Sequence, residues 1–200
     1  MEWALIIAMA VYSFTLAVTP GPNNTALLAI GGTHGLRATV PYLGGMVLGL
    51  AVLVSIMAIG LGALLELFPT VYLVMKYVAF GYVLFLAWKT FRAKPSQKTN
   101  GSGQPISVIQ AALFQLVNPK AWIATGTLIA AYVPEGATVW SFVVAGLTFI
   151  AATMPGAMMW AGAGQVVNYL LAGSRAHRIF SLVMAIALVT SMIPVLFLMS

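Results

Sequence analysis

Two short stretches carry the residue types that could bind a small polar solute, and both interrupt apolar runs. The first is Thr19-Pro20-Gly21-Pro22-Asn23-Asn24 and the second is Asn118-Pro119-Lys120. Proline lacks a backbone N–H and clashes with the carbonyl one turn earlier, so each stretch should break a helix and free several carbonyls. Gly21, between two prolines, should also permit unusual backbone dihedrals. Freed backbone groups, side-chain amides and an ammonium group together offer the donors and acceptors that such a solute needs.

Lys120 lies about twelve residues into its apolar run, too far from the end for its side chain to reach the membrane surface. A lysine at mid-bilayer costs at least about 2.5 kcal/mol, so it should face a cavity or a partner. We predict that it is the counter-charge for an amino-acid carboxylate, assisted by N–H groups at the start of a half-helix. Lys76 lies nearer the end of its run, where snorkelling explains it as well as substrate binding does.

The side-chain amides near the breaks offer donors and acceptors for an ammonium or hydroxyl group. Their alternative role is to bridge helices or to satisfy the broken backbone. With these amides, the predicted substrate-binding set is Pro20, Gly21, Pro22, Asn23, Asn24, Lys76, Gln115, Asn118, Pro119 and Lys120.

Composition places these stretches inside a membrane. Of the 200 residues, 62% are hydrophobic and 6% are charged, and the mean hydropathy is +1.02. A soluble domain of this size needs a more polar surface, so we predict an all-α polytopic membrane protein. The sequence has no cysteine, which excludes disulfides and thiolate metal sites. We expect no cofactor and no nucleic-acid partner, and a first segment that is retained rather than cleaved as a signal peptide.

Six apolar segments are long enough to span a bilayer, at about 3–30, 40–64, 67–88, 107–133, 138–171 and 179–198. The fifth is too long for one straight span and contains Pro155-Gly156, and a polar turn at 173–178 should precede the sixth. A hydrophilic linker at 89–105 joins two halves, about 1–88 and 106–200, of one transmembrane domain.

Charge predicts the orientation of these spans. The basic residues of the loops follow the first, third and fifth segments: Arg37, Lys89, Arg92, Lys94, Lys98, Arg175 and Arg178. The acidic residues Glu2, Glu66 and Glu135 lie at the opposite ends. Because positive residues accumulate in cytoplasmic loops, both termini are predicted outside.

Each half contains three spans, so the halves enter the membrane from opposite sides. Each also opens with a span that proline breaks, at Pro20–Pro22 and at Pro119. Two inverted repeats with broken helices in corresponding places are the best pointer in a sequence to the substrate site of a transporter. The spacing Gly45-Met46-Val47-Leu48-Gly49 would also allow close helix packing, including that of a homodimer.

Several motifs resemble those of the amino-acid exporter superfamily typified by the lysine exporter and the threonine/homoserine efflux proteins. They are Pro20-Gly21-Pro22-Asn23, the stretches 76–82 and 88–92, and Asn118-Pro119-Lys120-Ala121. The resemblance covers nearly the whole chain and implies an exporter in the bacterial inner membrane, driven by the proton gradient. The chain departs from the pattern at Gln115, where such proteins usually have a less polar or small residue, and in a fifth segment without acids.

The residues favour a neutral amino acid as the cargo. A cationic solute would need an anionic partner at mid-membrane, and the spans carry no acid there. A zwitterion would place its carboxylate at Lys120 and its ammonium at carbonyls freed around Pro20 and Pro22. Its side chain, as in threonine, homoserine or leucine, would enter a pocket walled by residues such as Leu27, Met46 and Ile123.

Other functions stay open at this point: export of a basic amino acid, another small solute or a cation, or a structural or pore-forming subunit. An intramembrane enzyme is disfavoured because no histidine or carboxylate lies at depth. For coupling to protons the candidates are Glu66, Glu135, a histidine or a lysine, and the sequence does not choose among them.

Overall fold

The computed structural model describes residues 2–60, 106–134, 136–170 and 174–190, and the single positions 77, 80, 81, 84, 87, 88 and 91. Over these residues the regular secondary structure is entirely helical, as the sequence predicts. Lys76, Glu66, Glu135, nearly all of the linker and the end of the sixth segment lie outside the described residues. The expectations that concern them therefore stay predictions.

The first predicted break is present, and it divides the first segment into two helices. α1 (Trp3–Val18) and α2 (Pro22–His34) meet at an angle of 60°. Pro22 begins α2, where its missing N–H costs nothing because the first turn has no intrahelical acceptor for it. A short 3₁₀ helix, η1 (Leu36–Thr39), leads into α3 (Val40–Ala58).

The second predicted break is also present, between α6 (Val108–Val117) and α7 (Pro119–Tyr132). α6 begins with a capping box, in which Ser107 and Gln110 each bond the other's backbone N–H. Asn118 ends α6, and its side-chain oxygen accepts from the backbone N–H of Lys120 to cap α7. Pro119 is the first residue of α7, again where a proline is tolerated.

The fifth segment forms a single helix, α8 (Val139–Leu170), which has 32 residues and continues through Pro155. A single proline removes one hydrogen bond, and packing against neighbouring helices tolerates that loss. α9 (Ser174–Thr190) already includes Arg175 and Arg178, so most of the expected polar turn is helical. Residues 174–178 contain no glycine or proline, and polarity alone does not stop a helix.

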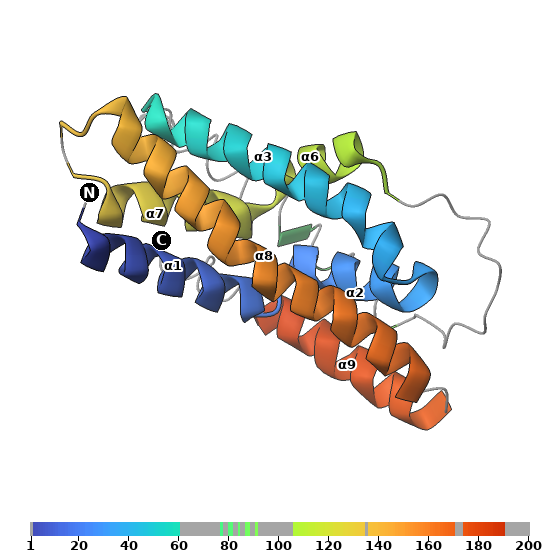
Figure 1. Ribbon diagram of the computed structural model, residues 1–200. Coiled ribbons are helices and arrows are strands. Elements are labelled where there is room, and N and C mark those ends of the chain that lie inside the picture. The colour runs from blue at the N-terminus through green and yellow to red at the C-terminus, as the bar shows by residue number, and fades with distance from the viewer. Residues whose placement is uncertain are drawn as a thin grey trace.

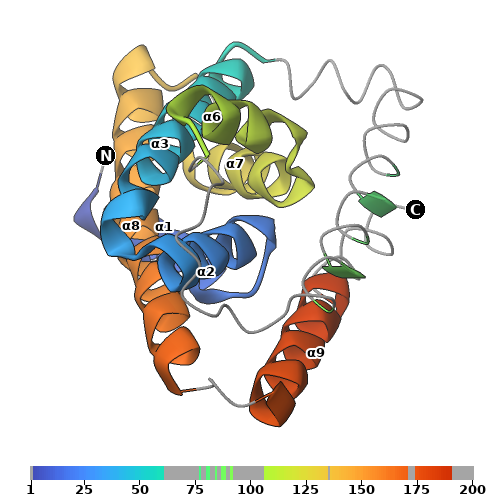
Figure 2. The ribbon, with the colours of Figure 1, turned by 90° about the vertical axis from the view of Figure 1, so that its right-hand side faces the viewer.

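α8 is the helix on which the bundle is assembled. It runs diagonally across α1 and α2, while α3 packs on α6 and α7 (Figure 1). α9 stands to one side of this group (Figure 2). A side-chain carbon at Gly156 would lie 2.6 Å from Ala17 Cβ, and one at Gly164 would overlap the carbonyl of Leu28. Glycine on α8 therefore permits close contact with both halves of the first broken helix.

The spaced glycines of α3 have a similar role inside the chain. A Cβ at Gly45 would lie 2.6 Å from Ala111 Cβ, and one at Gly49 would lie 2.5 Å from Gln115 Cγ. Both glycines are thus covered by α6 and are not free to form a dimer interface. The spacing of Gly45 and Gly49 therefore does not support a homodimer.

The outer surface is apolar, as a protein surrounded by lipid requires. Large side chains such as Trp3, Ile109, Val139 and Trp140 are 70–80% exposed. Two described helices are long and apolar enough to cross a membrane, at 36–58 and 139–167, and the bent pair α1–α2 could provide a third span. The full arrangement of six spans in two inverted repeats stays a prediction.

Candidate functional site

The two helix breaks lie against each other, although they are far apart in the sequence. Lys120, in the first turn of α7, extends to the break between α1 and α2, where its Nζ donates to Thr19 O at 2.7 Å and to Pro20 O at 3.2 Å. Asn23, in the first turn of α2, bonds Gln115 near the end of α6. Polar groups from the two breaks therefore form one site.

A reciprocal pair of amides joins the breaks. Asn23 Nδ2 donates to Gln115 Oε1 at 2.8 Å, and Gln115 Nε2 donates to Asn23 Oδ1 at 2.9 Å. The hydroxyl of Tyr42 also donates to Asn23 Oδ1 at 2.9 Å. Gln115 is completely buried and does not reach the cavity described below. Its contact with substrate stays a prediction, and in this conformation its two bonds position Asn23.

The side chain of Lys120 passes directly over Gly21. A Cβ at this position would lie 3.0 Å from Lys120 Cδ and 3.1 Å from its Nζ. The backbone of Gly21 is fully extended, with φ −174° and ψ 174°, which any residue can adopt. The unusual dihedrals expected of Gly21 are absent. Glycine leaves room here for the side chain of Lys120.

Two side chains of the protein occupy the carbonyls that the first break frees. Besides the two bonds of Lys120, Asn24 Nδ2 donates to Ala17 O at 2.9 Å and to Thr19 O at 2.6 Å. Thr19 O thus accepts from both side chains, whereas Ala17 O and Pro20 O each accept from one of them and keep a second lone pair. That a substrate ammonium meets these carbonyls stays a prediction. A proline-broken helix in an apolar setting needs such internal partners.

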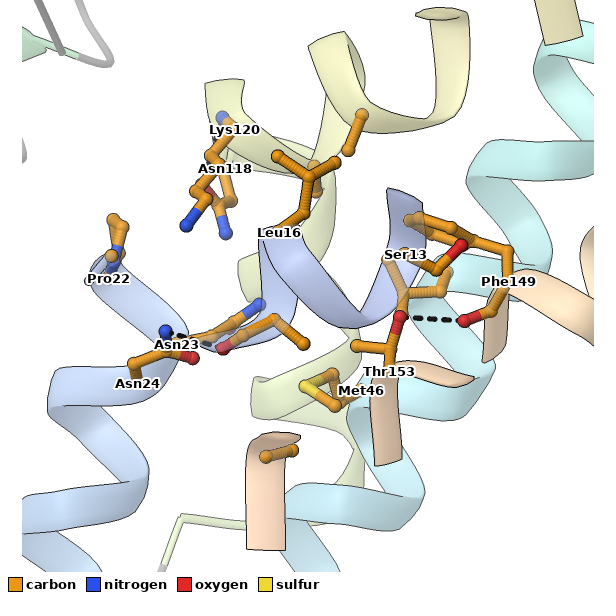
Figure 3. Close-up of a pocket in the computed structure, with 16 residues that line it drawn as sticks. Ser13, Leu16, Pro22, Asn23, Asn24, Met46, Asn118, Lys120, Phe149 and Thr153 are labelled. Atoms are coloured by element: carbon orange, nitrogen blue, oxygen red, sulfur yellow. Dashed lines mark hydrogen bonds between the residues drawn. The ribbon is translucent and has the colours of Figure 1, made fainter. Parts of the chain in front are cut away.

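A cavity of about 60 Å³ opens between the breaks (Figure 3). By a measure in which one water needs about 10–15 Å³, it admits on the order of four waters. Its polar lining is Ser13, Asn23, Asn24, Asn118, Lys120 and Thr153. Its larger apolar lining residues are Leu16, Met46, Leu50 and Phe149. The cavity thus has the mixed polar and apolar lining of a site for a small amphipathic molecule.

The polar groups gather at two ends of the cavity. Lys120 and Asn118 extend side by side at one end, near Pro22, whereas Ser13, Thr153 and Phe149 lie at the other, with Leu16 and Met46 between (Figure 3). The sequence analysis missed Ser13 and Thr153 because they lie on α1 and α8 and not at a break. The only signal was a hydroxyl in an otherwise apolar segment, which helices often carry for packing.

The outcome for the other predicted residues follows from the same geometry. Gly21, Pro22, Asn23, Asn24, Asn118 and Lys120 line the cavity. Pro20 contributes its carbonyl to Lys120, and Pro119 starts α7 without lining the cavity. Of the expected apolar wall, Met46 lines the cavity, but Leu27 belongs to the core and Ile123 packs beside Ala87 and Ala185.

The described residues form no group of three or more His, Asp or Glu side chains that could hold a metal. Lys120 is the only titratable side chain among the described residues of the lining. The chemistry this arrangement supports is reversible binding through charge and hydrogen bonds.

Comparison with known proteins finds similarity to transport proteins. A family model described as "LysE type translocator" matches residues 14–198. A cysteine/O-acetylserine efflux protein of Klebsiella pneumoniae is 32% identical over 172 residues, which cover 85% of this chain and 87% of that protein. The Escherichia coli (strain K12) protein of the same name is 28% identical over 191 residues, covering 94% of this chain and 96% of that protein. No solved structure matches the chain.

Proposed function

The chain belongs to the LysE type translocator family, and on this premise we propose that it exports a small neutral amino acid through the cavity between its helix breaks. Membership makes it an integral membrane protein and an amino-acid efflux transporter, not an enzyme. The proposal adds the class of substrate, the residues that bind it and the coupling to protons.

The ammonium of Lys120 is the observation that carries the proposal. An ammonium has three N–H donors, and Lys120 uses two of them on Thr19 O and Pro20 O. The third can meet a carboxylate oxygen inside the cavity. Asn118 lies beside it, with its Oδ1 used to cap α7 and its Nδ2 without a partner among the described residues. Together they supply one donor for each oxygen of a carboxylate, the stronger of which is charged.

The cavity also offers an acceptor for the amino group of the substrate. Both donor bonds of Asn24 go to backbone carbonyls, and among the described residues nothing donates to its Oδ1. Asn24 lines the cavity, so this oxygen can accept from a substrate ammonium near the carboxylate. A second positive charge on the side chain would find no acid in the described lining and would face Lys120.

The proposed cargo is therefore neutral and small. The relatives are named for cysteine and O-acetylserine, two amino acids without a charged side chain. A cavity of about 60 Å³ favours a small side chain, such as that of cysteine, homoserine or threonine. The distribution of loop charges supports two further parts of the proposal: the cargo comes from the cytoplasmic side, and both termini lie outside.

Proton antiport is proposed as the driving force on the basis of the family resemblance. The described lining contains no carboxylate or histidine, which leaves Lys120 as the first titratable group in the cavity to test. Glu66 and Glu135 stay alternative candidates.

Transport into everted membrane vesicles tests the proposal. Vesicles that contain the protein should accumulate labelled cysteine or homoserine under a pH gradient, with saturation. Lys120→Met keeps the length of the stem and removes the charge, so transport should fall at least about tenfold, the loss expected for a hydrogen bond to a charged group. Arg37→Met is the matched control, because it removes an exposed positive charge outside the cavity and should leave transport unchanged.

Three results would contradict the proposal at different points. Normal transport by a Lys120→Met variant present at wild-type abundance would refute the role of Lys120. Stronger competition by lysine or arginine than by any neutral amino acid would refute the substrate class. Flux without saturation would indicate a pore.

A further inference from the structure

Two hydroxyl groups from separate helices meet the cavity at the end away from Lys120. Ser13 lies on α1 and is completely buried, and Thr153 lies on α8 (Figure 3). Both residues line the cavity, yet neither belongs to a helix break. The charged end needs no help from them to bind the amino-acid backbone, so they are available for the side chain of the cargo.

The hydrogen bonds of these hydroxyls determine what they can recognise. Ser13 Oγ donates to Met9 O at 2.5 Å, and Thr153 Oγ1 donates to Phe149 O at 2.6 Å. Each hydroxyl has one proton, and each proton is already used within its own helix. What remains toward the cavity is acceptor capacity, which suits a group that carries a hydrogen.

We infer that Ser13 and Thr153 form a side-chain subsite that selects amino acids bearing a hydroxyl or thiol over apolar amino acids of the same shape. The inference rests on the proposed function, because it assumes that Lys120 and Asn118 hold the carboxylate. Between the two ends lie the apolar groups of Leu16, Met46, Leu50 and Phe149. They suit the carbon chain that connects the carboxylate end of a small amino acid to its polar tip.

Discrimination between polar and apolar amino acids follows from the free-energy cost of leaving a polar group without a hydrogen-bond partner. A side-chain O–H or S–H of the cargo can donate to one of these hydroxyl oxygens, whereas a methyl group in the same place offers no hydrogen bond. A single neutral hydrogen bond changes binding by about three- to tenfold. Two acceptors from two helices also fix the direction in which the polar tip points.

The experiment compares pairs of substrates that differ only in the polar atom. Cysteine is paired with 2-aminobutyrate, and homoserine is paired with norvaline, in competition for transport by everted vesicles. The measured quantity is the ratio of transport efficiencies within each pair, which does not depend on the abundance of the protein. Wild type should prefer the polar member, and Thr153→Val and Ser13→Ala should each reduce that preference by about three- to tenfold.

Matched controls separate this role from a general effect of losing a helix hydroxyl. Thr190→Val and Ser55→Ala remove the same kind of bond, from Thr190 to Ile186 O and from Ser55 to Ala51 O, on exposed positions outside the cavity. Both should leave the ratios unchanged. Thr153→Ser keeps the hydroxyl and should keep most of the preference.

The outcomes distinguish this inference from the proposed function. If wild type transports amino acids but shows no preference within either pair, the subsite is refuted. Unchanged ratios in both Thr153→Val and Ser13→Ala refute it equally. If wild type moves no amino acid at all, the proposed function fails, and the subsite fails with it.

Discussion

Replacing Asn23 and Gln115 by leucine, singly and together, measures how strongly the two helix breaks are joined. The wild-type pair exchanges two hydrogen bonds, at 2.8 and 2.9 Å. Hydrogen bonds between transmembrane helices contribute on average about 0.6 kcal/mol each and at most about 1.7 kcal/mol. We therefore expect a coupling free energy of roughly 1–3 kcal/mol between the two positions.

The structure predicts which of the two single substitutions destabilises the protein more. Gln115→Leu deprives Asn23 Nδ2 of its acceptor, but Asn23 is half-buried and lines the cavity, where water can replace the lost partner. Asn23→Leu is worse, because it leaves Gln115 completely buried with one weak bond, to Ala111 O at 3.4 Å. It also removes the acceptor at 2.9 Å from the Tyr42 hydroxyl. A buried polar group left without a partner costs about 1–3 kcal/mol.

The free energy of unfolding is measured in mixed micelles by titration with SDS. Wild type, the two single variants and the double variant together form a double-mutant cycle. Asn23→Leu should lower the free energy of unfolding by about 1–3 kcal/mol more than Gln115→Leu does. The double variant should be less destabilised than the sum of the single variants, since it removes both partners together. Additivity to within about 0.3 kcal/mol, or a greater cost for Gln115→Leu, would show that the amides do not join the breaks.

Two further predictions concern helix packing and orientation. Gly49→Ala should destabilise the protein by about 1–3 kcal/mol, because its Cβ would lie 2.5 Å from Gln115 Cγ and 2.6 Å from Ala112 O. Gly44→Ala, on the same helix with nothing within 4 Å, should be neutral or stabilise by up to about 1 kcal/mol, and equal costs for the two in the SDS titration would contradict the packing. A reporter fused at Gly101 should behave as cytoplasmic and one fused after Ser200 as external. Labelling of Gly101 from outside the cell would overturn that topology.

The sequence alone determined the features that depend on local backbone chemistry and on composition. Prolines placed both helix breaks correctly, because a missing N–H acts within one turn whatever surrounds it. Apolar composition identified a membrane protein, and the motifs at both breaks identified the family. At Pro155 a proline alone does not decide, because the long interfaces of α8 with α1 and α2 outweigh one lost hydrogen bond and the helix continues.

Only the tertiary structure decided which polar groups are partners. From the sequence, the amides could bind substrate, bridge helices or satisfy the broken backbone. The structure shows that Gln115 bonds Asn23, and that Lys120 and Asn24 bond the freed carbonyls. Lys120 lies about a hundred positions from the carbonyls of Thr19 and Pro20 that it bonds, and no helical period links such positions. Ser13 and Thr153 came to light for the same reason. The sequence does not show which way a hydroxyl on an apolar helix faces. The packing of α1 against α8 places these two hydroxyls beside one cavity.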